Sequence, residues 1–536
     1  MSAQSIESEG SATAPPTPPP RNRLALSTAI FAIATALSRV AGLVRESVAA
    51  NYFGTGPAAS AFTIASQIPN LMSNLFAQAA LSAAFVPVFT DLLQQGRKRE
   101  AFRLASTLFW IILVVLGALT ALGILLAGLI LPLFSGSHFD GSLAATLTQI
   151  MFPVVLLLGL TGMLVGILQS YDEFSIPAIA PLVWNVVIIG LLVALHSRFK
   201  QGIYAYAIAW LAATVVQMMM IAWALRRIDF RLRVEIDWRD PRVRQVFTLM
   251  LPVTIGLGIV NLDSLINSTF GALVNADGPR AIQLAFLIYM LPQGVFSVAV
   301  STVLFPTLSR QASRRAVGEM RRTLGTGMRQ INLLLIPAAA GLAVLATPIT
   351  RLVFQRGDFT AYSTHLTSIA LFWFAWSLPF GGLNLLLTRT FFALQRPWIP
   401  TRLAAINMLV DIVLSVGLYK PLGIAGLVIG TAVANIVMTW LQLRRLRIGF
   451  NGRLEGGRTL MITVRILLAS VVTAAIARGA WVGVNHVVGT STVGQIVSVG
   501  VAVGLGGAFY AWAVLRMRIP EARQIESLVL SRLPGR

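Results

Sequence analysis

The sequence predicts an all-α polytopic membrane protein, and three observations carry that prediction. Of its 536 residues, 56% are hydrophobic and only 12% are charged, whereas an ordinary soluble domain has about 25% charged residues. Many apolar runs reach the roughly 20 residues that a helix needs to cross about 30 Å of hydrocarbon. Most arginines stand in short loops between these runs, as membrane topology requires. The chain has no cysteine, which excludes disulfides and thiolate metal sites.

About fourteen membrane spans result when the chain is divided at its charged and Gly/Pro-rich loops. The expected ranges are 24–46, 58–92, 104–132, 143–169, 176–196, 202–225, 245–273, 281–309, 323–348, 363–393, 399–418, 422–443, 461–483 and 493–516. Pro69 and Pro292 lie inside the second and eighth of these ranges. Such interruptions free backbone groups that a neighbouring helix or a wet cavity must satisfy, which is typical of transporters.

The loops alternate in charge, and this alternation predicts the orientation. The loops near 97–103, 226–244, 310–322 and 444–458 carry about twenty-one Lys and Arg, against about six on the opposite side. The positive-inside bias places the rich side in the cytoplasm, and an even number of spans places both termini there. Residues 1–23, which are rich in proline, are expected to form a disordered cytoplasmic tail, and 519–536 a second tail.

An internal repeat divides the spans into two lobes. Two pairs of matching motifs stand about 220 residues apart: Phe85-Val86-Pro87 with Leu304-Phe305-Pro306, and Leu168-Gln169 with Leu394-Gln395. That offset covers six helices, an even number, so the halves are parallel repeats with a shared midplane site expected between them. The predicted units are a six-helix lobe at 24–244, a second at 245–458, and two extra helices at 459–518.

The first span contains charges at positions where charges are costly in a membrane. Arg39 and Arg45 are six residues apart, and Glu46 follows directly. Arg45 and Glu46 suit either a cavity or a pair at the membrane interface. Arg39 lies about a turn and a half deeper, which favours a wet cavity over a structural pairing.

The second half offers a candidate cation site. Asp263 and Asp411 are the acids well inside its spans, and Asn407 precedes Asp411 by one turn on the same helix face. Oxygen ligands of this kind suit a hard cation. A helix–helix hydrogen bond is the alternative, and both interpretations stay open.

Neither an enzyme nor a nucleic-acid-binding protein is indicated. The four histidines are scattered without metal-ligand spacing, and no GxxxxGK[ST] loop is present to bind a nucleotide. No stripe of basic and aromatic residues resembles a nucleic-acid platform. Any energy input therefore has to come from an ion gradient, the membrane potential or the substrate's own gradient.

Several motifs together resemble one family, the MurJ/MviN lipid II flippases of the multidrug/oligosaccharidyl-lipid/polysaccharide exporter superfamily. The motifs that carry the resemblance are the stretch from Ser38 to Glu46, Ile68-Pro69-Asn70-Leu71, Leu291-Pro292-Gln293-Gly294, Phe305-Pro306-Thr307-Leu308-Ser309 and Phe354-Gln355-Arg356-Gly357-Asp358-Phe359. The resemblance covers roughly residues 24–516.

The resemblance implies two six-helix lobes around a cationic cavity in the bacterial cytoplasmic membrane, with a groove for the polyprenyl tail formed by the two extra helices. The implied substrate is lipid II, the undecaprenyl-pyrophosphate-linked peptidoglycan precursor, which is moved from the inner to the outer leaflet by alternating access. Membrane lipids and cell-wall synthesis proteins are the other expected partners, and nucleic acid is not one.

The resemblance also implies site residues. Arg39, Arg45 and Glu46 are the expected substrate-binding charges. Ser60, Ser73 and Asn74 stand where the family often has charged residues and are expected to bind substrate as well, with Ser73 and Asn74 donating hydrogen bonds near the pyrophosphate. Leu287 and Met290 in the eighth span also stand where the family has charged residues. For Na⁺ as a coupling ion, the implied ligands are Asn407, Asp411, Thr431 and a residue of the seventh span, either Asp263 or Asn267.

Two alternative functions stay open at this stage. One is a flippase for another polyprenyl-linked glycan, or a related exporter. The other is a scaffold of the cell-wall synthesis complex that transports nothing. The sequence does not decide between them and lipid II transport.

Overall fold

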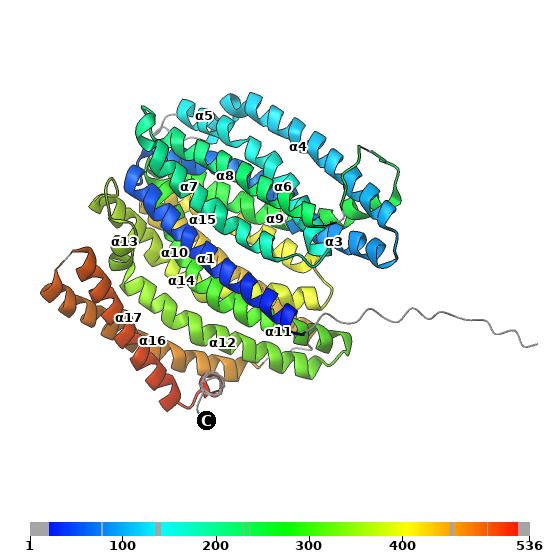
Figure 1. The fold of residues 1–536 in the computed structure, drawn as a ribbon. Coiled ribbons are helices and arrows are strands. Elements are labelled where there is room, and N and C mark those ends of the chain that lie inside the picture. Colours follow the sequence, from blue (N-terminus) through cyan, green and yellow to red (C-terminus); the bar gives the residue numbers. More distant parts are fainter. Residues whose placement is uncertain are drawn as a thin grey trace, which may run out of the picture.

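The computed structural model describes residues 21–76, 79–134, 141–228, 230–234, 236–450, 455–489 and 491–523. Side chains at 21–33, 68, 73–84, 130, 132–134 and several positions between 249 and 264 lie outside the description. Most of the expected tails, at 1–20 and 524–536, also lie outside it. The described chain forms a bundle of long helices that run roughly side by side (Figure 1).

The first lobe contains eight α-helices in the described residues. They are α1 (Arg21–Phe53), α2 (Pro57–Phe76), α3 (Ala79–Gln94), α4 (Lys98–Phe134), α5 (Gly141–Met151), α6 (Pro153–Ser170), α7 (Ser175–Leu195) and α8 (Ile203–Ala224). Short 3-10 turns follow α7 and α8, at His196–Arg198 and Leu225–Arg227.

The second lobe is followed by a two-helix hairpin. The lobe comprises α9 (Pro241–Val274), α10 (Gly278–Pro292), the π-turn η3 (Gln293–Ser297), α11 (Val298–Ser313), α12 (Val317–Val344), α13 (Ala346–Phe354), α14 (Ala361–Ala393) and α15 (Trp398–Gly449). The hairpin is α16 (Gly456–Val488) and α17 (Thr492–Arg516).

Ten helical stretches in the described part are long and apolar enough to cross a membrane. They confirm the predicted all-α membrane fold, while the count of fourteen spans stays a prediction. The stretch Trp398–Gly449 is one of the ten, yet Gly423 within it has a φ of 58°. Glycine tolerates this left-handed conformation. The chain therefore bends at Gly423, the second residue of the expected span 422–443.

Pro153 and the π-turn after Pro292 interrupt other helices, whereas Pro69 lies inside α2 without ending it. Pro153 begins α6, where its missing N–H leaves no additional unpaired donor. Pro292 ends α10, and the π-turn that follows shifts the register before α11 begins.

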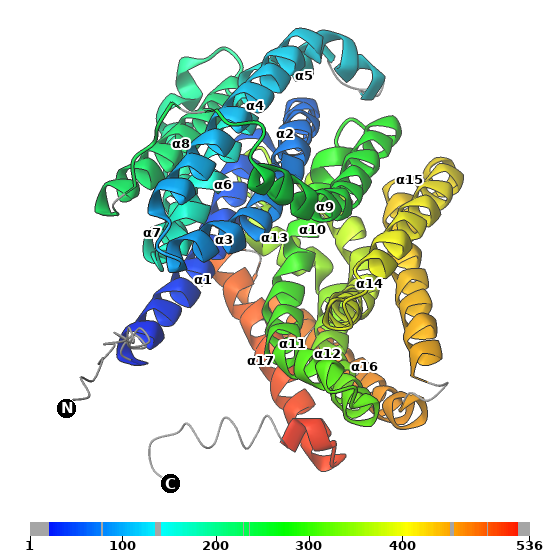
Figure 2. The ribbon, with the colours of Figure 1, turned by 90° about the vertical axis from the view of Figure 1, so that its right-hand side faces the viewer.

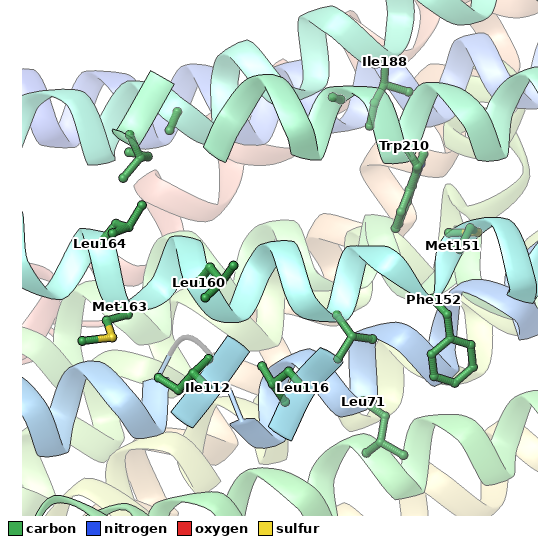
Figure 3. Packing of buried hydrophobic residues seen from close by; sticks show 14 of the residues in the cluster. Leu71, Ile112, Leu116, Met151, Phe152, Leu160, Met163, Leu164, Ile188 and Trp210 are labelled. Atoms are coloured by element: carbon green, nitrogen blue, oxygen red, sulfur yellow. The ribbon is translucent and has the colours of Figure 1, made fainter. Parts of the chain in front are cut away.

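The two large hydrophobic cores lie mainly one in each lobe, and α9 of the second lobe contributes Leu265 and Ala272 to the first core. One gathers residues between Ala49 and Ala272, and the other is formed mainly by residues between Ile282 and Phe450. In the first core, Ile112 and Leu116 of α4 lie close to Leu160 of α6 (Figure 3). Helix pairs recur as well, since α4 packs on α6 as α12 packs on α14, and α3 packs on α6 as α11 packs on α14.

The α16–α17 hairpin lies against α12 at the edge of the second lobe (Figure 2). A small core of Leu333, Ile336, Ile462, Ile466 and Val514 fills the contact. The buried Arg329 of α12 completes it.

Arg329 ties both ends of the hairpin to the lobe. Its Nη1 lies 3.0 Å from Glu455 Oε2 at the start of α16, and its Nε donates to the buried Glu521, which follows α17. One guanidinium therefore holds the segments where the hairpin begins and ends.

Candidate functional site

The two lobes contact each other along α9, which packs on α2 and α3, and again at the end of the bundle opposite the basic loops. Backbone Asp358 N donates to Asn51 O at 2.9 Å, and the hydroxyls of Thr55 and Ser363 lie 2.8 Å apart. Gly54, between the first-lobe partners, has a φ of 56°, and a Cβ there would overlap the backbone of Asp358. The turn after α1 therefore needs glycine to reach the second lobe.

Beside this contact, three charges form a buried cluster. Arg45 Nη2 lies 2.6 Å from Glu46 Oε1, and Arg280 Nη2 lies 2.8 Å from Glu46 Oε2. Glu46 and Arg280 are only 6% and 2% exposed. Because α1 belongs to the first lobe and α10 to the second, Glu46 is shared between cations of both lobes.

The remaining polar groups of Arg45 have partners within the first lobe. Arg45 Nη1 donates to Asn185 Oδ1 at 3.0 Å, and the guanidinium stacks 4.9 Å from the ring centre of Trp184 and 5.3 Å from that of Trp210. Such stacking stabilises a desolvated cation. Tyr206 OH donates to Glu46 at 3.4 Å. In this conformation Arg45 and Glu46 stabilise the lobe contact, and their expected role toward substrate stays a prediction.

Arg39 lies apart from this cluster and is exposed. Its guanidinium lies over Gly294 of the π-turn in the second lobe, where a Cβ would overlap Arg39 Nη1. Arg39 thus places a permanent charge, accessible from outside the packed core, at the seam between the lobes. This is the geometry that an arginine needs in order to bind an anionic group.

The other expected substrate residues differ in their surroundings. Ser60 is fully buried, and its hydroxyl donates to Thr55 O at 3.3 Å, so it faces the interior of the first lobe. Ser73 and Asn74 lie on α2, but their side chains are outside the described part of the structure. Their role as substrate ligands stays a prediction.

The expected ion ligands Asn267, Asp411 and Thr431 come together. Asn267 Nδ2 donates to Asp411 Oδ2 at 2.9 Å, and Thr431 Oγ1 lies 3.2 Å from the same oxygen. Ser415 Oγ donates to Asp411 Oδ1 at 3.3 Å. A Cβ at Gly430 would lie 3.1 Å from Asp411 Oδ1, so the absence of a side chain lets the two halves of α15 approach here.

The structure says less about the other two expected ion ligands, Asn407 and Asp263. Asn407 Oδ1 is buried, and within the described residues no group donates to it. The side chain of Asp263 lies outside the description. A cation bound at Asp411 requires Asn267 to rotate its amide and present Oδ1, because the amide nitrogen now faces the carboxylate.

The pairing of Arg280 with Glu46 was not predicted from the sequence. The expected span began at 281, so Arg280 was counted among the loop residues, whereas α10 begins at Gly278. Arg280 Nη1 also donates to Gln283 Oε1 at 2.7 Å, and Thr63 of α2 donates to the same oxygen at 3.0 Å. The signal in the sequence was that Arg280 stands directly before the apolar span expected to begin at 281.

Comparison with known proteins agrees with this architecture. The family model described as lipid II flippase MurJ matches residues 49–501. A probable lipid II flippase MurJ of Rhizobium meliloti (strain 1021) is 31% identical over 460 residues, which cover 84% of this chain and 85% of that protein. The lipid II flippase MurJ of Burkholderia cenocepacia is 31% identical over 423 residues, covering 77% and 82%.

Solved structures share the fold. A lipid II flippase MurJ in an inward closed conformation superposes with a TM-score of 0.75 at 23% identity, covering 91% of this chain and 99% of that one. An inward-facing multidrug resistance transporter of the MATE family gives a TM-score of 0.68 at 14% identity, covering 77% and 94%. This chain thus shares its fold with both structures.

Proposed function

The chain belongs to the MurJ family of lipid II flippases, and we propose that it moves lipid II from the inner to the outer leaflet of the bacterial cytoplasmic membrane. The observation that carries this proposal is the family match over residues 49–501. Transport proceeds by alternating access between two lobes, without a chemical step. The substrate's pyrophosphate enters between the lobes, and its polyprenyl tail stays in the membrane.

Arg39 is the residue that we assign to the pyrophosphate. It is exposed and lies at the lobe seam beside Gly294. Arginine offers a planar, permanently charged donor set that matches phosphate oxygens. Arg45 and Glu46 contribute to transport by stabilising the contact between the lobes opposite the basic loops. Their partners in this conformation are Arg280, Asn185 and each other.

From the contacts opposite the basic loops, the Glu46–Arg280 ion pair and the bond from Asp358 N to Asn51 O, we infer a state that is closed at that end. With the basic loops in the cytoplasm, the closed side faces outward. The orientation is tested with Arg314→Cys and Arg447→Cys, since the chain has no native cysteine. Neither cysteine should react with an impermeant thiol reagent in intact cells, whereas the cysteine of Lys200→Cys on the other side should react. Labelling at both 314 and 447 contradicts the orientation.

Na⁺ is the coupling ion that we propose for the second lobe. Support comes from the convergence of Asn267, Asp411 and Thr431, together with the buried Oδ1 of Asn407. Carboxylate, amide and hydroxyl oxygens suit a hard cation. Binding at Asp411 joins α9 to both halves of α15, so the ion couples to the shape of the second lobe.

Genetic complementation tests the function. Cells depleted of their own lipid II flippase should grow when they express this chain. An exporter of drugs or a non-transporting scaffold would fail to restore growth, and failure with normal expression and membrane insertion would contradict the proposal.

A further inference from the structure

A pocket lies in the second lobe where α12, α14, α15 and α16 meet near the basic loops. Its volume is about 860 Å³, which falls in the range of about 300–1,000 Å³ for small-molecule sites. Along α12 it extends from Arg321 to Asn332, a distance of roughly 16 Å at 1.5 Å per residue. It therefore extends from the membrane interface into the hydrocarbon depth of the bundle.

The first lobe has a counterpart in the same place. A pocket of about 560 Å³ lies between α4, α6, α8 and the segment that follows α8. Four lining residues of one pocket match four of the other at offsets of 218 or 219 residues: Phe109 with Met328, Leu164 with Leu383, Leu225 with Leu443, and Arg226 with Arg444. This is the offset of the internal repeat, so the pocket is a feature of the repeated lobe.

Both pockets combine an apolar wall with arginines at the basic-loop end. In the second lobe these are Arg321, Arg444 and Arg447, and the guanidinium of Arg444 lies 5.5 Å from the ring centre of Trp440. Arg321 Nε is buried, and no described group accepts its hydrogen. Glu455 also lines this pocket and pairs with Arg329, and the three arginines outnumber this one acid in the lining.

The first-lobe pocket has the same composition. Arg226 and Arg231 stand at its rim, above Phe109, Leu160 and Leu164. It receives no residue from α16 or α17, so this first-lobe pocket differs from a tail groove built by those two helices. A ligand common to both must be anionic at one end and apolar along its length.

We propose that these pockets bind anionic phospholipids of the leaflet that faces the basic loops, one lipid in each lobe. The phosphate lies against Arg321 and Arg444 in one pocket, and against Arg226 and Arg231 in the other. Basic pockets between membrane helices on the cytoplasmic side suit such headgroups. The apolar walls take the acyl chains, and the bound lipid links the basic loop to the helices of its lobe.

Native mass spectrometry of the delipidated full-length protein tests this. The protein is titrated with dioleoyl-phosphatidylglycerol or with zwitterionic dioleoyl-phosphatidylcholine, and bound lipids are counted. Two tightly bound phosphatidylglycerol molecules are expected. The pair Arg321→Gln/Arg444→Gln should weaken one about 30-fold, and Arg226→Gln/Arg231→Gln the other, at about fivefold per arginine.

Matched variants separate the pocket from general surface charge. Arg310→Gln/Arg314→Gln removes two exposed arginines from the same face outside both pockets and should leave both lipids bound. Leu443→Trp fills the second-lobe pocket without a change of charge and should remove the same lipid as Arg321→Gln/Arg444→Gln. If the Arg321→Gln/Arg444→Gln variant does not fold, the number of phosphatidylglycerol molecules bound to Leu443→Trp tests the second-lobe pocket.

Three results would overturn the proposal. One is equal binding of the two phospholipids, and another is an equal loss in Arg310→Gln/Arg314→Gln. The third is displacement of phosphatidylglycerol by inorganic phosphate or by undecaprenyl phosphate, which would assign the pockets to a free anion or to the substrate's carrier.

Discussion

Glu46 of α1 and Arg280 of α10 form an ion pair of 2.8 Å that joins the two lobes inside the protein. Arg45 holds the other oxygen of the same carboxylate at 2.6 Å. One carboxylate is therefore shared by two cations, one from each lobe, and the contact between the lobes at this end depends on it.

Glu46→Gln should open this end and destabilise the protein. Removing one partner of a buried pair leaves an uncompensated charge, at a cost of about 3–5 kcal/mol. The thermal unfolding midpoint should fall, and a cysteine at the buried Thr55 should become more reactive toward thiol reagents.

Two controls accompany this variant. Glu100→Gln makes the same change at an exposed ion pair with Arg97 and Arg242 and should alter neither readout. The double variant Glu46→Gln/Arg280→Gln should recover part of the lost stability, because one of the unpaired cations is gone. Equal effects of Glu46→Gln and Glu100→Gln would refute the role of Glu46 in holding the two lobes together.

Gly294→Ala should impair transport while the protein still folds. The added Cβ overlaps Arg39 Nη1, and the flexible arginine side chain moves away from the lobe seam. Growth of flippase-depleted cells measures the effect. Gly341→Ala, where a Cβ meets open space, is the matched control and should grow normally. Normal growth of Gly294→Ala would show that the position of Arg39 does not matter.

Asp411→Asn should abolish the response to Na⁺. Binding to the folded state raises the unfolding midpoint as ligand concentration rises, so wild type should gain stability in Na⁺ relative to K⁺ at fixed ionic strength and pH. Thr431→Val should weaken the gain, and Asp277→Asn, between α9 and α10, should retain it. An equal response to K⁺, or an unchanged response in Asp411→Asn, would leave Asp411 in a helix–helix contact only.

Arg329→Met should loosen the α16–α17 hairpin. It leaves Glu455 and the buried Glu521 without their shared cation, at a cost of about 3–5 kcal/mol. Limited proteolysis near the ends of the hairpin should become faster. Arg322→Met, an exposed position two turns earlier on α12, should be silent. Equal proteolysis of the two variants would contradict the anchoring role.

The sequence predicted the helices better than it predicted their partners. Apolar runs and loop charges are local signals, so the helices and the repeat could be predicted from them. The spacing of Asn407 and Asp411 placed them on one helix face, and the resemblance added Thr431. The partnerships of Glu46 with Arg280 and of Arg329 with Glu521 join residues 234 and 192 positions apart. No periodic pattern specifies a contact of that range, because packing of whole helices creates it.

The most direct test of the account is lipid II translocation by the purified protein in proteoliposomes. Wild type should expose labelled lipid II on the opposite leaflet faster than protein-free vesicles do. Arg39→Ala should lose most of that activity while keeping its thermal unfolding midpoint, and Arg39→Lys should recover only part, because a lysine lacks the planar donor set. Translocation by Arg39→Ala at the wild-type rate, or no translocation by wild type, would contradict it.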